Sequence, residues 1–214
     1  MITKFNFSYF ISQNDISLSE DILNMGQKDT VKSNYILSNI GDKIDYIYYI
    51  VGGKLALNAI SSDGKEKSCM FIKENMFYGE AHIYNSFPTI FKVVTVVPTV
   101  FVKFKIQLAR HLIETSQEFR MVFIHAQSQK IRSMTGEIVS MMIHTPEERV
   151  LHYLIDQSKH NKCENKEKTL CLSQQAIAEV LGMHRVTVAN ALLKLKKEGY
   201  ISCARNAITL LRLE

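Results

Sequence analysis

The spacing of apolar residues changes close to Phe104. From Thr30 to Lys105, short runs rich in Ile, Val, Tyr and Phe are separated by turn residues such as Gly52-Gly53 and Asp63-Gly64. Runs of this kind, bounded by Gly, Asn and Asp, are typical of β-strands joined by tight turns. We therefore expect an antiparallel β-roll in which hairpins reverse at these two turns.

Beyond Phe104 the apolar period lengthens to about 3.6 residues, which indicates helices. Within residues 116–142 an isoleucine recurs every seven positions, and a Gln or Met follows each isoleucine three positions later. Such a heptad pattern suits pairing with a second helix. A helix lying on its own β-roll would also carry apolar residues at this spacing, so both alternatives stay open. The predicted dimer interface consists of Ile124, Gln127, Ile131, Met134, Ile138 and Met141.

Capping-box patterns predict where two of the helices begin. Ser17 with Glu20 predicts a short helix ahead of the roll, and Thr145 with Glu148 predicts another. Pro146 suits the first position of this later helix, because an N–H there would have no partner within the helix.

These patterns divide the chain into three predicted parts. The β-roll occupies residues 1–115, the long helix and a hinge occupy 116–144, and a C-terminal domain occupies 145–214. The first helix of the C-terminal domain should end in the polar stretch 157–168, which we expect to be an exposed loop.

Two short helices joined by a tight turn are predicted near the C-terminus. Ser173 can cap the first helix, and Gly182 supplies the turn to a second helix that opens at His184. The first helix should bury Ile177, Val180 and Leu181, and the second Val188, Leu192 and Leu195. The opposite stripe of the second helix faces away from this core, as in a recognition helix that enters the major groove. That stripe consists of Arg185, Val186, Ala189 and Asn190.

A basic hairpin is expected to follow. Gly199 should end the second helix, and two strands around Arg205-Asn206 then form a wing. Residues 185–213 carry an excess of five positive charges, equal to the formal charge of +5 of the whole chain, and such a segment suits a polyanionic partner. An interaction module with an inactive helix-turn-helix is the alternative. The predicted DNA contacts are Ser173, Gln174, His184, Arg185, Val186, Thr187, Ala189, Asn190, Lys194 and Arg205.

Other classes of protein are disfavoured by the sequence. The four cysteines are scattered with no Cys-x-x-Cys pair, so we expect reduced thiols rather than a zinc site, an iron–sulfur cluster or a disulfide framework. No glycine loop or nucleophile motif points to an enzyme, and neither a cofactor nor a metal is expected. The polar N-terminus does not fit a secretory signal, and the longest apolar run, Val93 to Val102, is too short to span a membrane. The expected location is the cytoplasm, with no membrane partner.

The order of β-roll, long helix, hinge and winged helix-turn-helix resembles the CRP/FNR superfamily of bacterial transcription regulators over nearly the whole chain. Gly79-Glu80 matches the signature of the roll in that family, Pro146 to Arg149 matches its P-E-E-R hinge, and residues 172–195 match its helix-turn-helix. The resemblance implies an α+β fold with a jelly roll like that of cyclic-nucleotide-binding domains. It also implies a homodimer that binds double-stranded DNA and contacts RNA polymerase.

Departures from the family pattern bear on the effector. Cyclic-nucleotide-binding relatives carry an Arg-Ser or Arg-Thr pair about ten residues after Gly-Glu, whose arginine pairs with the cyclic phosphate. No arginine lies between Glu80 and Arg110, and the first cysteine is Cys69, so neither cyclic AMP nor an iron–sulfur cluster is expected. A small-molecule effector, no effector at all, or haem bound through His82 stay open. The motifs GMHRVTV and DGKEK resemble the halorespiration regulators, which sense chlorinated aromatic acids. The candidate effector pocket consists of Gly79, Glu80, His82, Ile124, Gln127 and Ile131.

The recognition helix also departs from its relatives. Those that read the best-known operators present Glu and Arg four residues apart, where this chain has Val186 and Asn190. Valine suits the thymine methyl group and asparagine can bond bidentately to adenine, so we expect an A·T-rich palindrome. Arg185 is free for a guanine or a phosphate, and His184 and Thr187 suit phosphate contacts.

Overall fold

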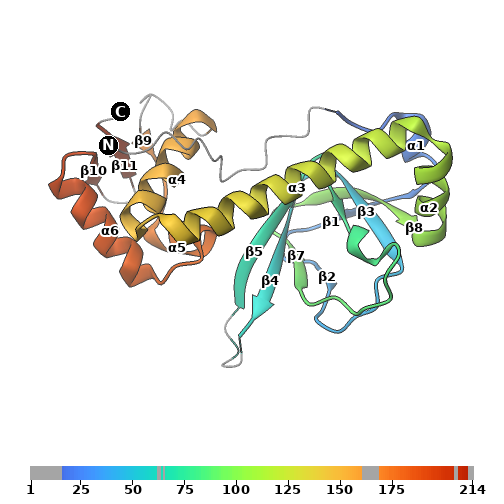
Figure 1. The fold of residues 1–214 in the computed structure, drawn as a ribbon, viewed down its shortest axis with the longest axis horizontal. Helices are drawn as coiled ribbons and strands as arrows, with labels where there is room; N and C mark the ends of the chain where they lie inside the picture. Colours follow the sequence, from blue (N-terminus) through green and yellow to red (C-terminus); the bar gives the residue numbers. More distant parts are fainter. Residues whose placement is uncertain (1–15, 62–63, 65, 161–168, 205–206, 212–214) are drawn as a thin grey trace. The chain divides into compact units, whose positions relative to one another are not determined.

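A computed structural model describes residues 16–61, 64, 66–160, 169–204 and 207–211 (Figure 1). The chain forms two compact units, one ending at Ile131 and the other beginning at Arg132. The boundary between them falls within the long helix α3 (Gln117–Ile143).

The first unit is the predicted antiparallel β-roll, built from two four-stranded sheets. One sheet has the order β1 (Gln27–Val31), β8 (Thr99–Lys105), β3 (Tyr46–Gly52), β6 (Phe77–Tyr78). The other has the order β2 (Ile36–Ser38), β7 (Lys92–Thr95), β4 (Lys54–Ile60), β5 (Glu66–Lys73). Apolar side chains from both sheets, among them Ile50, Leu55, Ile72 and Phe101, pack into one buried cluster.

The hairpin predicted at Gly52-Gly53 is wrong, because β3 and β4 belong to different sheets. The chain crosses from one sheet to the other at this point. Gly53 has φ +104°, and a Cβ there would lie 2.5 Å from Thr99 Oγ1, so the corner requires glycine. The second predicted hairpin is confirmed, since β4 pairs with β5 up to Ile60 and Glu66. Ser62 and Asp63 of its turn lie outside the described residues.

Helix α2 (Ile106–Thr115) packs on the roll through aliphatic side chains such as Leu112, and the first half of α3 packs on it through aromatic ones. The ring of Phe119 in α3 lies edge-on to Phe77 and to Phe104, with 5.6 Å between ring centroids in each pair. Phe119, Val122 and Ala126 are buried on this side of α3. The roll therefore holds one face of the long helix.

The short helix α1 (Glu20–Leu23) begins later than predicted. Its N-cap is Ser19, not Ser17, and Glu20 directly follows the cap and so cannot close a capping box. Glu118 of α3 supplies the missing carboxylate, because its oxygens accept hydrogen bonds from Ser19 N–H at 2.5 Å and from Ser19 Oγ at 3.0 Å. A partner distant in sequence replaces the local one.

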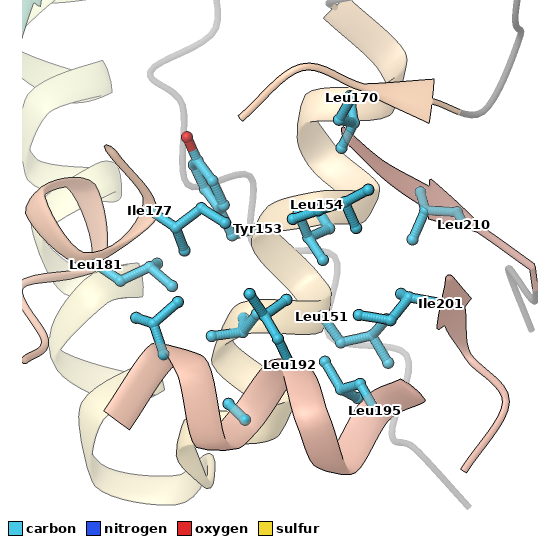
Figure 2. Close-up of a cluster of buried hydrophobic side chains, with 14 of the residues drawn as sticks. Leu151, Tyr153, Leu154, Leu170, Ile177, Leu181, Leu192, Leu195, Ile201 and Leu210 are labelled. Atoms are coloured by element: carbon cyan, nitrogen blue, oxygen red, sulfur yellow. The ribbon is translucent and has the colours of Figure 1, made fainter. Parts of the chain in front are cut away.

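In its described residues the second unit contains the end of α3, three further helices and a three-stranded sheet. Its elements are α4 (Pro146–His160), β9 (Thr169–Leu170), α5 (Gln174–Leu181), α6 (Arg185–Lys197), β10 (Ile201–Ala204) and β11 (Ala207–Leu210). Leu154, Ile177, Leu192 and Ile201 meet in its core, so α4, α5, α6 and the sheet share one apolar centre (Figure 2).

The start of α4 is as predicted, and its end is not. Thr145 N–H donates to Glu148 Oε2 at 2.8 Å, while Glu148 N–H donates to Thr145 Oγ1 at 3.3 Å, which completes the capping box. Residues 157–160 continue α4 instead of opening a loop. The remainder of that stretch, 161–168, lies outside the described residues.

Replacing Phe119 with Ala should lower the free energy of unfolding by about 3–5 kcal/mol, because a buried ring would leave a cavity between α3 and the sheet. Urea unfolding followed by circular dichroism measures this change. Gln117→Ala, at an exposed position of the same helix, should change stability by less than about 1 kcal/mol. Similar losses in both variants would show that Phe119 does not anchor the helix.

Candidate nucleic-acid interface

The turn between α5 and α6 has the predicted capping residues. Ser173 is the N-cap of α5, and its side-chain oxygen accepts a hydrogen bond from Ala176 N–H at 3.1 Å. Gly182 follows α5 with φ +62°, and Met183 N–H donates to the Ala178 carbonyl at 2.9 Å. The two helices are bent by 110° at this turn, within the range of about 90–120° found in helix-turn-helix motifs.

Helix α6 buries one side and exposes the other. Val188, Leu192 and Leu195 are buried, as predicted, so their stripe holds the helix against the core. Val186 is 69% exposed, on the side of α6 that faces away from this core. The exposed predicted contacts are Ser173, Gln174, His184, Arg185, Val186, Asn190 and Lys194, whereas Thr187 and Ala189 are half-buried.

Leu193, which is not among the predicted contacts, is 60% exposed on α6. It follows Val186 and Asn190 at the i, i+4, i+7 spacing of one helix face. The outward stripe therefore extends about one turn beyond the predicted residues. The same spacing argument that identified the inward leucines would have found it.

The C-terminal end of α6 is basic and capped. Lys194, Lys196 and Lys197 occupy its last turn, where the helix dipole favours positive charge. Gly199 has φ +77°, and Tyr200 N–H donates to the Leu195 carbonyl at 3.0 Å, which is the bond of a Schellman motif. The predicted helix end is confirmed.

Lys194 has a partner within the protein. Its Nζ lies 3.3 Å from Oε1 of Glu147, in the first turn of α4. The carboxylate of Glu147 accepts a hydrogen bond from the backbone N–H of Glu147 itself. This bond and the nearby Lys194 lower the pKa of Glu147. The carboxylate is therefore ionised near neutral pH, and it competes with any anionic partner of α6 for the Lys194 ammonium.

The predicted wing is a hairpin of β10 and β11, which pair antiparallel up to Ala204 and Ala207. Arg205 and Asn206, between these strands, lie outside the described residues, as does Cys163. Cys203 is free and exposed, as is Cys69 in the roll. Cys171 is disulfide-bonded, so the expectation of reduced thiols is wrong for this residue.

In the roll, Gly79 and Glu80 lie where β6 leads into a short 3-10 helix (Glu80–His82). Gly79 has φ +92°, and a Cβ there would lie 2.6 Å from the Tyr46 carbonyl oxygen. Glu80 Oε1 lies 2.8 Å from Nζ of Lys130 in α3. Lys130, which the sequence analysis missed, continues the buried stripe of α3 four residues after Ala126.

No described hydrogen bond or ion pair joins the other predicted pocket residues to this pair. Ile124 and Ile131 are 53% and 65% exposed. His82 Nδ1 donates to the Phe87 carbonyl at 2.9 Å, and His82 borders a cavity of about 380 Å³ beside Arg110. Of the predicted set, only Glu80 has a side-chain interaction with α3 among the described contacts.

Arg110, the first arginine after Glu80, is bound to the protein itself. Its Nε donates to the Ile83 carbonyl at 2.7 Å, its Nη2 donates to the same oxygen, and its guanidinium lies 5.4 Å from the centre of the Tyr84 ring. These bonds hold the guanidinium at the loop that follows Gly79-Glu80.

Two family models match the chain. The cyclic nucleotide-binding domain matches residues 28–116, and the Crp-like helix-turn-helix domain matches residues 148–214, so together they take in well over half of the sequence. The chain belongs to the CRP/FNR superfamily. The family and the α+β fold predicted from the sequence are thereby confirmed.

Relatives agree with this membership. The "Global nitrogen regulator" of Nostoc sp. is 23% identical over 186 residues, which are 85% of this chain and 83% of the relative. The c-di-GMP responsive regulator CLP of Xanthomonas campestris has a TM-score of 0.77 at 18% identity, over 90% of this chain and 97% of its own. A CRP/FNR-family regulator from Thermus thermophilus has a TM-score of 0.70 at 19% identity, over 87% of this chain and 94% of its own. The two structural likenesses show the fold.

Members of the CRP/FNR superfamily are DNA-binding transcription regulators with a sensory domain of the cyclic-nucleotide-binding type, and this chain has that function. The named relatives are regulators, not enzymes. Among the described residues no single helix is long and apolar enough to cross a membrane; α5 and α6 pass on length and composition only as a bent pair.

Replacing Glu147 with Gln should tighten DNA binding, because it releases Lys194 and removes a negative charge beside basic α6. We expect about two- to threefold higher affinity for specific and random duplexes alike at low salt, and a smaller gain as salt rises. Fluorescence anisotropy with a labelled duplex measures it. Glu114→Gln, an exposed change of equal charge in α2, is the control; an equal gain there would exclude a role for Lys194.

Proposed function

We propose that this regulator binds an A·T-rich palindrome as a homodimer, through the exposed stripe of α6, and that the β-roll controls this binding. The observation that carries the proposal is the outward stripe of Val186 and Asn190 on a helix bent by 110° from α5. Regulators of the CRP family bind DNA and act as dimers.

Two residues of this stripe set the base preference. Val186 offers methyl groups to a thymine methyl, and Asn190 can both donate to and accept from one adenine edge. Arg185 takes a guanine or a phosphate beside them. The remaining contacts position the helix through phosphates. They come from Ser173, Gln174, His184, Thr187, Lys194 and Arg205, with Ala189 close to the groove wall.

The partner for the dimer is a second copy paired along α3. Ile124, Ile131 and Ile138 are each more than half exposed on this helix, although Phe119 and Val122 of the same helix are buried. The two alternatives for α3 are thus compatible, since different faces serve the roll and the partner. Self-complementary heptad faces favour an isologous pair. Met134 and Met141 are exposed as well, and Gln127 is half-buried.

The effector of the roll is not cyclic AMP in this proposal. Arg110, the first arginine after Glu80, donates to the backbone of Ile83, which leaves it engaged within the protein. The candidate effector region is the surrounding of Gly79 and Glu80. Contact with RNA polymerase and action in the cytoplasm belong to the same proposal, since a transcription regulator must meet both DNA and polymerase.

Selection of bound duplexes from a random pool by the purified protein, without added ligand, tests this function. We expect an A·T-rich palindrome whose half-site centres are about 34–36 Å apart, one helical turn of DNA. Selection of no sequence, with or without candidate effectors, would contradict the proposal. Enrichment of a G·C-rich palindrome would retain the dimeric regulator and reject the reading by Val186 and Asn190.

Replacing Asn190 with Ala should cost about 1–3 kcal/mol of discrimination per half-site, because the adenine loses its bidentate partner. Competition between the selected duplex and duplexes changed at single positions measures this loss. Lys197→Ala, on the same helix, should weaken all duplexes equally and reduce the salt dependence. The same uniform loss in Asn190→Ala would assign Asn190 to the phosphates.

Replacing Ile131 with Glu should separate the dimer, because two carboxylates would face each other at the centre of the seam. Sedimentation analysis should show a monomer, and affinity for the palindrome should fall by about 100-fold. Ile90→Glu is the matched control, since Ile90 is 71% exposed in a loop of the roll. A dimeric Ile131→Glu protein would place the interface elsewhere.

A further inference from the structure

A buried lysine links the long helix to the β-roll. Lys130 is 5% exposed, and of the described residues it is the only lysine or arginine in the protein core. Its Nζ lies 2.8 Å from Glu80 Oε1 and also donates to the Phe77 carbonyl. One ammonium group thus binds both β6, at its first residue Phe77, and the 3-10 helix that follows this strand.

This ion pair is not expected to add much to the free energy of unfolding. Removing two charges from water costs several kcal/mol per ion, and the mutual attraction offsets this only when the remaining polar atoms are satisfied. Glu80 Oε2 and Gln127 Nε2 are buried without a hydrogen-bond partner among the described protein atoms. An apolar residue at position 130 would simply extend the buried stripe of Val122 and Ala126. The pair therefore fixes a geometry more than it stabilises the fold.

The geometry that it fixes is the position of α3 on the roll. Lys130 stands directly before Ile131 and one turn after Ala126, so its contact with Glu80 fixes the C-terminal end of the buried face of α3, next to the exposed Ile131. A ligand acts by binding one arrangement of a protein better than another. A side chain of the protein itself that binds Glu80 and Phe77 in only one arrangement of α3 on the roll favours that arrangement in the same way.

We infer that Lys130 is a positioning residue that acts as a tethered ligand of the β-roll. Its ammonium binds the Glu80 carboxylate and the Phe77 carbonyl, and so holds α3 in the arrangement that pairs with a second copy. The regulator can therefore bind DNA without a free effector. This inference rests on the proposed homodimeric DNA-binding function. It specifies the regulation of that site by an internal cation.

Chemical rescue tests the inference. Lys130→Ala removes three methylene groups and the ammonium, which together correspond to n-propylammonium. We expect this variant to bind the selected duplex about 5- to 150-fold more weakly than the wild type in fluorescence anisotropy. Added n-propylammonium chloride should restore most of the lost affinity. Tetramethylammonium chloride at equal ionic strength has no N–H donor and should restore none, which also controls for the salt dependence of DNA binding.

Two further variants separate positioning from folding. Lys28→Ala removes an exposed lysine of the roll, and it should bind DNA like the wild type and show no response to n-propylammonium. If Lys130→Ala does not fold, Lys130→Met combined with Glu80→Gln replaces the pair by neutral side chains of similar size. We expect this double variant to fold, by circular dichroism, and to bind the duplex as weakly as stated above.

The outcomes are distinguishable. A folded Lys130→Ala protein, or the double variant, that binds DNA like the wild type overturns the inference and retains the proposed function. A wild type that binds DNA only after an effector is added also overturns the inference and retains the proposed function. Weak binding that n-propylammonium does not restore overturns the tethered-ligand role of Lys130. Absence of DNA binding by the wild type under all conditions overturns the proposed function itself.

Discussion

The packing of one face of α3 against the β-roll is the interaction on which the rest of this structure depends. Phe119 joins the aromatic cluster of Phe77 and Phe104, and Val122 and Ala126 continue the contact. Because a helix has a fixed period, burying these residues decides that Ile124 and Ile131 face outward. The face that packs on the roll and the proposed dimer face are thus two sides of one helix.

Local signals were predicted well from the sequence, and long-range ones were not. The Thr145–Glu148 box, the Ser173 cap and the Gly182 turn depend on partners within a few residues. By contrast, the cap at Ser19 depends on a carboxylate 99 residues away, and the Lys130 contact with Phe77 spans 53 residues. The crossing at Gly53 was misread because glycine serves hairpins and sheet corners alike.

The C-terminal domain that carries α5 and α6 shows how one scaffold supports different operators. Its core leucines and the capped turn hold α6 rigidly, while the outward stripe makes no contribution to that core. Val186, Asn190 and Leu193 are therefore free to differ from the residues of other family members without a cost in folding. The family identity establishes a DNA-binding regulator, and the proposed sequence preference rests on Val186 and Asn190.

Gly79 has a consequence for how the sequences of related proteins change during evolution. Its positive φ and the nearby Tyr46 carbonyl leave no room for a side chain, whatever molecule occupies the roll. Selection would therefore retain this glycine in descendants that have exchanged one small molecule for another, or have lost the need for any. The glycine of the Gly-Glu signature is therefore explained by backbone sterics, and its presence does not identify the molecule that the roll senses.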